Sequence, residues 1–249
     1  KIVLLTSTII SLSTEKLISG FSAKYGNVRH VQMDSISYHG MLEANLSTFG
    51  VRALPTYNFD KADVIVSFGA DFLGNWGSTD YATDYATGRN PKNKKMSKHY
   101  QIESTLTLTG SNADERIPIK PSEQAGLLSN LYNALNGKNS DNRITKIVSS
   151  LKSAKSSIVV CNSNDKDVQL LVNSINNILG NYERGTIDMS NPSYLKKGND
   201  EDVATLVSDM NAGNIDALIT YNVNPSYTLA NADEFNKGLA KVGLKVSTS

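Results

Sequence analysis

The segment best placed to do chemistry is a glycine-bearing turn that follows an apolar run. Val64–Phe68 is rich in β-branched residues, and Gly69, Ala70 and Asp71 come directly after it. A short continuous apolar run is typical of a strand that is buried on both faces of a parallel sheet. Because open α/β sheets bind ligands at the carboxyl ends of their strands, this turn predicts a binding crevice.

The same pattern occurs a second time, 153 residues later. Ala217–Tyr221 is again a run of mainly aliphatic residues, and Asn222 and Asn224 follow it. Upstream, Ile2–Ser7 is similar to Ile158–Ser163 at nearly the same offset. We therefore predict two α/β lobes of similar plan, over residues 1–155 and 156–249. A chance likeness between ordinary strand–helix units is the alternative.

No other residue pattern indicates a catalytic or metal site. The histidines, His30, His39 and His99, are scattered without the spacing of metal ligands. Cys161 is the single cysteine, so it can form no internal disulfide and cannot hold an iron–sulfur cluster, which needs about four such ligands. It lies in an apolar strand pattern, and we expect it to be buried and unreactive. The sequence also lacks the Gly-x-Gly-x-x-Gly, Walker and Gly-x-Ser-x-Gly motifs.

Helical patterns alternate with strand patterns along the chain, which is typical of an α/β fold with mainly parallel, Rossmann-like sheets. Over residues 72–98 the regular patterns stop, so we expect a long loop that holds Trp76 and ends in the basic run Arg89–His99. A loop of this length is usually functional or mobile, and we interpret the basic run as a solvated arm. A strand is predicted over Tyr100–Leu108. The predicted helices include residues 40–49, 122–136, 165–179 and 199–211.

Composition narrows the class of protein. The chain has 249 residues, enough for one large or two small domains, and a net charge of +1. This balance gives no electrostatic reason to expect a nucleic-acid partner. The apolar runs are too short to span a bilayer, so we expect no direct membrane insertion. The sequence opens at Lys1 directly in a strand pattern and ends at Ser249 in another, so we expect a piece of a longer protein.

Several segments, in order and spacing, resemble the large subunit of the molybdopterin oxidoreductase family. They are Asp34–Gly40, Phe49-Gly50, Ala62–Leu73, Glu103-Ser104 and Thr109–Pro121. Three further segments resemble the molybdopterin-like, iron–sulfur subunit of alternative complex III, a bacterial quinol-oxidising respiratory assembly: Gly180–Tyr182, Asp209–Gly213 and Asn222–Pro225. The resemblance covers nearly the whole chain.

The resemblance implies two middle α/β domains that clasp a bis-molybdopterin-guanine-dinucleotide cofactor. It would place Gly69, Ala70, Asp71, Trp76, Asn222 and Asn224 along the cofactor cleft. The family's protein ligand to molybdenum precedes the helix that ends at Phe49-Gly50, which makes Ser37 the candidate ligand here; a turn-capping serine is the alternative.

The sequence also departs from the family pattern. The amino-terminal cysteine motif for a [4Fe–4S] cluster is absent, so iron–sulfur clusters are expected only in regions outside this sequence. Relatives in alternative complex III are thought to carry no molybdenum cofactor in this domain. Our first hypothesis is therefore a cofactor-free scaffold, not catalytic on its own, with haem and iron–sulfur subunits as partners on the periplasmic face of the cytoplasmic membrane.

Two other hypotheses stay open. The chain could be a genuine cofactor-binding part of a catalytic oxidoreductase. It could also be a nucleotide-binding module that uses the strand ends alone, although the missing glycine fingerprint counts against that function.

Overall fold

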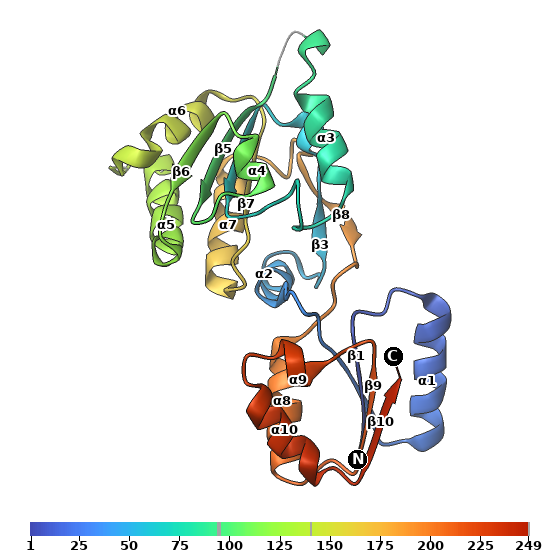
Figure 1. Cartoon of the computed structure of the whole chain (residues 1–249). Helices are drawn as coiled ribbons and strands as arrows, with labels where there is room; N and C mark the ends of the chain where they lie inside the picture. Colours follow the sequence, from blue (N-terminus) through green and yellow to red (C-terminus); the bar gives the residue numbers. More distant parts are fainter. Residues whose placement is uncertain (94–95, 140, 249) are drawn as a thin grey trace. The chain divides into compact units, whose positions relative to one another are not determined.

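The structure is a computed structural model that describes residues 1–93, 96–139 and 141–248. The chain forms two compact units (Figure 1). Unit 1 contains residues 1–42 and 194–249, and unit 2 contains residues 43–193. Helix α2 (His39–Phe49) spans the boundary at residue 42. No helix among the described residues combines the length and the apolar character that a bilayer crossing requires.

Unit 1 is built on a parallel sheet with the strand order β10-β9-β1-β2. Helix α1 lies on one face of this sheet, and α8 and α10 lie on the other (Figure 1). The elements are β1 (Ile2–Thr6), α1 (Leu12–Tyr25), β2 (Val28–Gln32), α8 (Asp200–Asn211), β9 (Ala217–Tyr221), α9 (Pro225–Thr228), α10 (Ala232–Lys241) and β10 (Leu244–Thr248).

Unit 2 is built on a second parallel sheet, with the order β6-β5-β4-β7, and on an antiparallel pair of β3 and β8. Helices α5, α6 and α7 bury one face of the parallel sheet. The elements are β3 (Leu54–Tyr57), β4 (Val64–Phe68), α3 (Asp80–Gly88), β5 (Lys98–Glu103), α4 (Leu108–Ser111), β6 (Glu115–Pro118), α5 (Gln124–Leu135), α6 (Thr145–Ser153), β7 (Ser157–Cys161), α7 (Lys166–Ile178) and β8 (Ile187–Ser193). Both sheets confirm the predicted α/β fold with Rossmann-like parallel sheets.

Two local predictions differ from the structure. The predicted loop over 72–98 contains α3, whose Tyr81 and Tyr85 are buried although the helix shows no extended apolar stripe. The strand predicted over Tyr100–Leu108 ends at Glu103, and the chain then forms the short helix α4. Thr107 caps α4, because its hydroxyl accepts a hydrogen bond from the amide of Gly110.

The predicted division into lobes 1–155 and 156–249 also differs from the two units. Strand β7, which opens the second predicted lobe, pairs with β4, while β1 pairs with β9. Each half of the sequence therefore contributes strands to both sheets. A sequence offset identifies which strands are alike, but hydrogen bonding between non-consecutive strands decides which of them share a sheet.

One edge of the unit 2 sheet is closed by side chains. The outward amide and carbonyl of Val159 bond to the side chain of Asn176, at 3.1 and 2.8 Å. Thr186 donates to the carbonyl of Ser157, and Gln169 donates to the carbonyl at the end of β7. Because β7 is the last strand in its sheet, these bonds satisfy buried backbone groups that no further strand reaches.

We predict that Asn176→Ala lowers the free energy of unfolding by roughly 2–4 kcal/mol, because it leaves two buried backbone groups of Val159 without partners. Denaturant unfolding measures the change. Asn177→Ala, at the exposed neighbouring position, is the matched control and should change stability by less than about 0.5 kcal/mol. Equal effects of the two substitutions would contradict this account of the edge.

Candidate functional site

The two units carry equivalent strand ends. The residue after β4 is Gly69, with φ 69°, and the residue after β9 is Asn222, with φ 54°. Asn222 is the one non-glycine residue with a positive φ among the described residues. Asn162 follows β7, and its backbone amide donates to the carbonyl of Phe68. In the same way, Ser7 follows β1, and its backbone amide donates to the carbonyl of Tyr221. The structure therefore reproduces the predicted repeat at the level of backbone conformation and hydrogen bonding.

In unit 2 the strand end is filled by the chain itself. A Cβ atom at Gly69 would lie 2.6 Å from Oδ1 of Asn162, closer than any real contact. Gln124 from α5 holds Asn162 in place, since its Nε2 donates to Asn162 Oδ1 at 2.9 Å and to the carbonyl of Phe68 at 2.8 Å. Glycine is favoured at position 69 by its positive φ, and a side chain there would also displace the exposed Asn162 side chain.

The helix that follows β7 offers no free site for an anion. Asp165 caps α7, and its Oδ1 accepts hydrogen bonds from the amides of Asp167 and Val168 at 2.8 and 3.0 Å. A phosphate group at a helix N-terminus uses these same amides. The Asp165 carboxylate both occupies them and repels a second negative charge.

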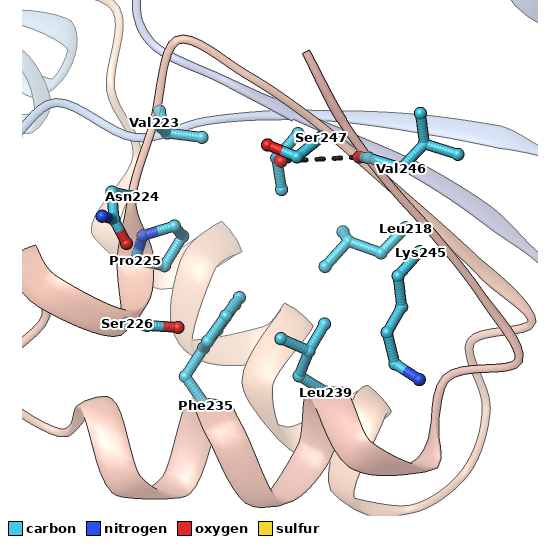
Figure 2. A pocket seen from close by; sticks show the side chains of 11 residues that line it. Leu218, Val223, Asn224, Pro225, Ser226, Phe235, Leu239, Lys245, Val246 and Ser247 are labelled. Atoms are coloured by element: carbon cyan, nitrogen blue, oxygen red, sulfur yellow. Dashed lines mark hydrogen bonds between the residues drawn. The ribbon is translucent and has the colours of Figure 1, made fainter. Parts of the chain in front are cut away.

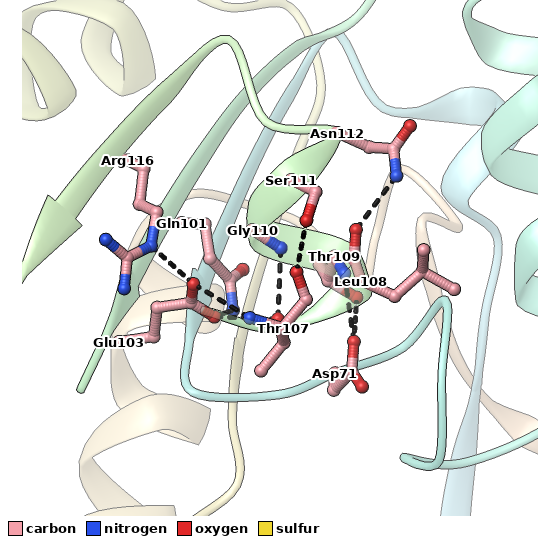
Figure 3. Close-up of polar contacts among 10 residues, drawn as sticks. All are labelled: Asp71, Gln101, Glu103, Thr107, Leu108, Thr109, Gly110, Ser111, Asn112 and Arg116. Carbon is pink, nitrogen blue, oxygen red and sulfur yellow. Dashed lines mark hydrogen bonds and ion pairs between the residues drawn. The ribbon is translucent and has the colours of Figure 1, made fainter. Parts of the chain in front are cut away.

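The Asp71 carboxylate is hydrogen-bonded to α4 and stabilises the turn that follows β4. Its Oδ1 accepts hydrogen bonds from the amide and hydroxyl of Thr109 at 2.9 and 2.7 Å (Figure 3). Thr109 Oγ1 also accepts a hydrogen bond from the amide of Leu73. Ala70 is buried, and its carbonyl accepts from Ser67. The residues predicted for the first cofactor cleft therefore connect β4 to α4.

Glu103, at the end of β5, is a buried carboxylate that the sequence did not mark as a site residue. Burial alone would raise its pKa, but hydrogen bonds from Arg116, Thr107 and Gln101 more than offset that effect and hold the pKa below its ordinary value. A Cβ atom at Gly110 would lie 2.0 Å from Glu103 Oε1. Figure 3 shows this carboxylate enclosed by the α4 turn and by β6.

Trp76 belongs to an aromatic core and is only 8% exposed. Its ring lies 5.6 Å from that of Tyr57 and 6.2 Å from that of Tyr81, measured between centroids. The spacing of these residues in the sequence gave no sign of this cluster, since Tyr57 lies in β3 and Tyr81 in α3.

The unit 1 strand end is more open. Asn222 donates from Nδ2 to the hydroxyl of Ser7 at 3.1 Å. Asn224 lines a cavity of about 410 Å³ that lies between the sheet and α10 (Figure 2). Phe235 and Leu239 form its apolar wall, and Lys245 brings a positive charge to it.

The candidate molybdenum ligand, Ser37, already has hydrogen-bond partners in the chain. Ser37 donates from Oγ to Asp200 Oδ2 at 2.7 Å and accepts from the amide of His39 at 3.1 Å, so it acts as a turn cap before α2. Cys161 is fully buried, and burial raises the pKa of its thiol to about 12, as expected for an unreactive cysteine. The described part of the chain holds no group of three or more histidine, cysteine or acidic side chains arranged for a metal.

No protein-family model and no curated protein matches this sequence. Among solved structures, the chain is similar to acetylene hydratase from Pelobacter acetylenicus, with a TM-score of 0.71 and 11% identity over 99% of this chain and 46% of that chain. It is also similar to the formyltransferase/hydrolase complex (FhcABCD) from Methylorubrum extorquens in complex with methylofuran, with a TM-score of 0.62 and 13% identity over 89% of this chain and 68% of that chain. At these identities the likeness shows the α/β fold alone, and the chain spans less than half the length of the hydratase.

His99 differs from the prediction of a solvated basic arm. Arg89 pairs with Asp114, while His99 is 0% exposed and lies beside Tyr85, whose hydroxyl is 3.1 Å from Nδ1. Lys94 and Lys95, in the same run, lie outside the described residues. Burial lowers the pKa of His99 to about 4, and Gln101, Arg89, Asp114 and Glu103 alter it to a smaller extent.

We predict that His99 makes the fold acid-sensitive. The unfolded chain takes up a proton near pH 6.5, but the folded chain does so only near pH 4, so stability is lost as pH falls through this window, by roughly 3 kcal/mol at most. Unfolding measured from pH 7 to pH 4 should show a shallower loss in His99→Gln than in the wild type. An identical pH profile in both proteins would contradict the assignment.

We predict that Gly69→Ala lowers the free energy of unfolding by about 2–4 kcal/mol, since it adds a clash with Asn162 to the strain of a positive φ. Gly137→Ala is the control, because Gly137 has φ 84° with open space around its α-carbon; it reports the φ strain alone, about 1 kcal/mol. The double variant Gly69→Ala/Asn162→Ala should approach the control. If Gly69→Ala costs no more than Gly137→Ala, the strand end is not filled.

Proposed function

We propose that this chain is a molybdopterin-oxidoreductase-like scaffold of a respiratory, quinol-oxidising electron-transfer complex, and that it works without a cofactor of its own. The assignment to this class of protein rests on the resemblance of its sequence motifs to that family. Its two Rossmann-like sheets and its likeness in fold to two enzymes agree with a shared architecture.

The observation that favours a scaffold is the filled strand end of unit 2. Asn162 and Gln124 occupy the place where a ligand would approach Gly69, and Asp165 occupies the anion site of α7. A dinucleotide would have to displace two hydrogen-bonded side-chain amides, and its phosphates would face the Asp165 carboxylate, which already accepts hydrogen bonds from the α7 amides. The candidate metal ligand, Ser37, is already engaged in capping.

As a scaffold, the chain would support neighbouring haem and iron–sulfur subunits, with its clusters held in regions outside this sequence. By family, such an assembly works on the periplasmic face of the cytoplasmic membrane, and the chain would reach the membrane through its partners. These assignments rest on the resemblance.

One observation favours a second candidate function, a genuine bis-molybdopterin-guanine-dinucleotide site in a catalytic oxidoreductase. Asn224 lines a cavity of about 410 Å³ beside the carboxyl end of β9, where this class of fold binds ligands. Unit 1 would then hold part of the cofactor, although unit 2 has its equivalent place filled.

Elemental analysis for molybdenum and tungsten on the full-length protein, purified natively with its partners, separates the two functions. We predict neither metal in stoichiometric amount, with haem and non-haem iron as the internal positive control. About one molybdenum or tungsten atom per chain would contradict the scaffold and favour the catalytic function.

A further inference from the structure

Hydrogen-bond register aligns the two parallel sheets residue by residue. In unit 2, Val64 pairs with Ser157 on one side and Lys98 on the other. In unit 1, Ala217 pairs with Ile2 and Leu244 in the same way. The amides of Lys98 and Leu244 even bond to equivalent carbonyls, those of Asp63 and Asp216. Strands β7, β4 and β5 are therefore the counterparts of β1, β9 and β10.

Equivalent side chains differ sharply in exposure. Phe68 and Tyr100 are 0% and 2% exposed, while their counterparts Tyr221 and Val246 are 43% and 38% exposed. In unit 2, α5 covers these positions with a row of leucines: Leu127, Leu128 and Leu131. In unit 1, an apolar cavity of about 470 Å³ lies there, lined by sheet residues such as Ile219 and by residues of α1.

Helix α1 carries the apolar pattern of a helix that packs against a neighbour. Counted from the first residue of each helix, Leu17, Ile18, Phe21 and Tyr25 of α1 match a set of apolar residues in α7 and at its C-cap: Leu171, Val172, Ile175 and Leu179. In unit 2, this set packs in the core that contains α5. In α1, no residue is buried, and Leu17 is 72% exposed.

Strand β10 adds an open edge beside this groove. It is the last strand in its sheet, and the amide of Leu244 points inward to Asp216. Alternate residues point the other way, so the amides of Lys245 and Ser247 face outward. The counterpart edge of β5 pairs in parallel with β6, and α5 follows β6 in the chain.

We propose that the α1–β10 face of unit 1 docks a strand–helix segment from outside residues 1–248. Its strand runs parallel to β10 and bonds to the outward amides of Lys245 and Ser247. Its amphipathic helix fills the groove beside α1 and carries leucine-like residues spaced as in α5. The occupant is inferred from what unit 2 places on the equivalent face, and peptide recognition by strand addition and by a helix in a groove is well established.

The proposal rests on the repeated register and not on the lack of a cofactor. Molybdenum in the purified protein would overturn the scaffold and leave this inference standing. Two other occupants are possible on such a face, a second copy of this chain and a lipid, and the experiment separates them.

The test uses the natively purified assembly with a photo-crosslinking amino acid at Leu17, and at Leu106 as the control. Leu106 is 63% exposed and belongs to unit 2. We expect Leu17 to crosslink to one defined stretch whose sequence is a strand followed by an amphipathic helix, and Leu106 not to do so. Crosslinks from Leu17 to residues 1–248 of a second copy, to lipid, or to nothing would overturn the proposal.

Amide hydrogen exchange gives the second readout. In the assembly, the amides of Lys245 and Ser247 should exchange on the order of 100-fold more slowly than unprotected amides. The variant Leu17→Asp/Val246→Asp should lose that protection while α8 and α10 keep theirs, because both substituted side chains are exposed. Unprotected amides in the wild-type assembly would contradict strand addition at β10.

Discussion

The pairing of each half's opening strand with the other half's central strand is the constraint on which this structure depends. Strand β7 pairs with β4, and β1 pairs with β9. Neither half of the sequence can therefore complete a sheet alone, because the first strand of each half pairs with a strand of the other half. In the unit 1 sheet, β1 and β9 also mark the point where successive connections leave in opposite directions, which is where α/β folds form ligand crevices.

The two units share this architecture but differ at the strand end: side chains occupy it in unit 2, and a cavity lies beside it in unit 1. At the unit 2 strand end, the polar groups are hydrogen-bonded within the chain. Gln124 donates to Asn162 and to the carbonyl of Phe68, and Asp165 accepts from the first amides of α7. The nearby carboxylates, Asp71 and Glu103, accept hydrogen bonds that hold the turn around α4. Such internal satisfaction stabilises the fold because unpaired buried polar groups are costly. It also leaves few donors that a bound dinucleotide could use.

Much of this organisation could be predicted from the sequence. The strand run before Gly69 and its repeat before Asn222 correctly marked the two strand ends, and apolar periodicity marked most helices. Strand partnership could not be predicted, because the sequence offset shows which strands are alike, whereas β1 pairs with β9 and β7 with β4. The role of Glu103 and the aromatic contacts of Trp76 depend on residues brought together only by folding. A glycine such as Gly110 is compatible with a close approach, but the sequence does not identify the carboxylate that it contacts.

The central claim is that the chain binds no pterin, because its own side chains occupy the strand end of unit 2. The most direct measurement is to denature and oxidise the full-length protein, purified natively with its partners, and to quantify the released pterin by fluorescence. Unlike metal analysis, this measurement also detects a cofactor that has lost its metal. The account predicts pterin far below one equivalent per chain. One or two pterins per chain would contradict it.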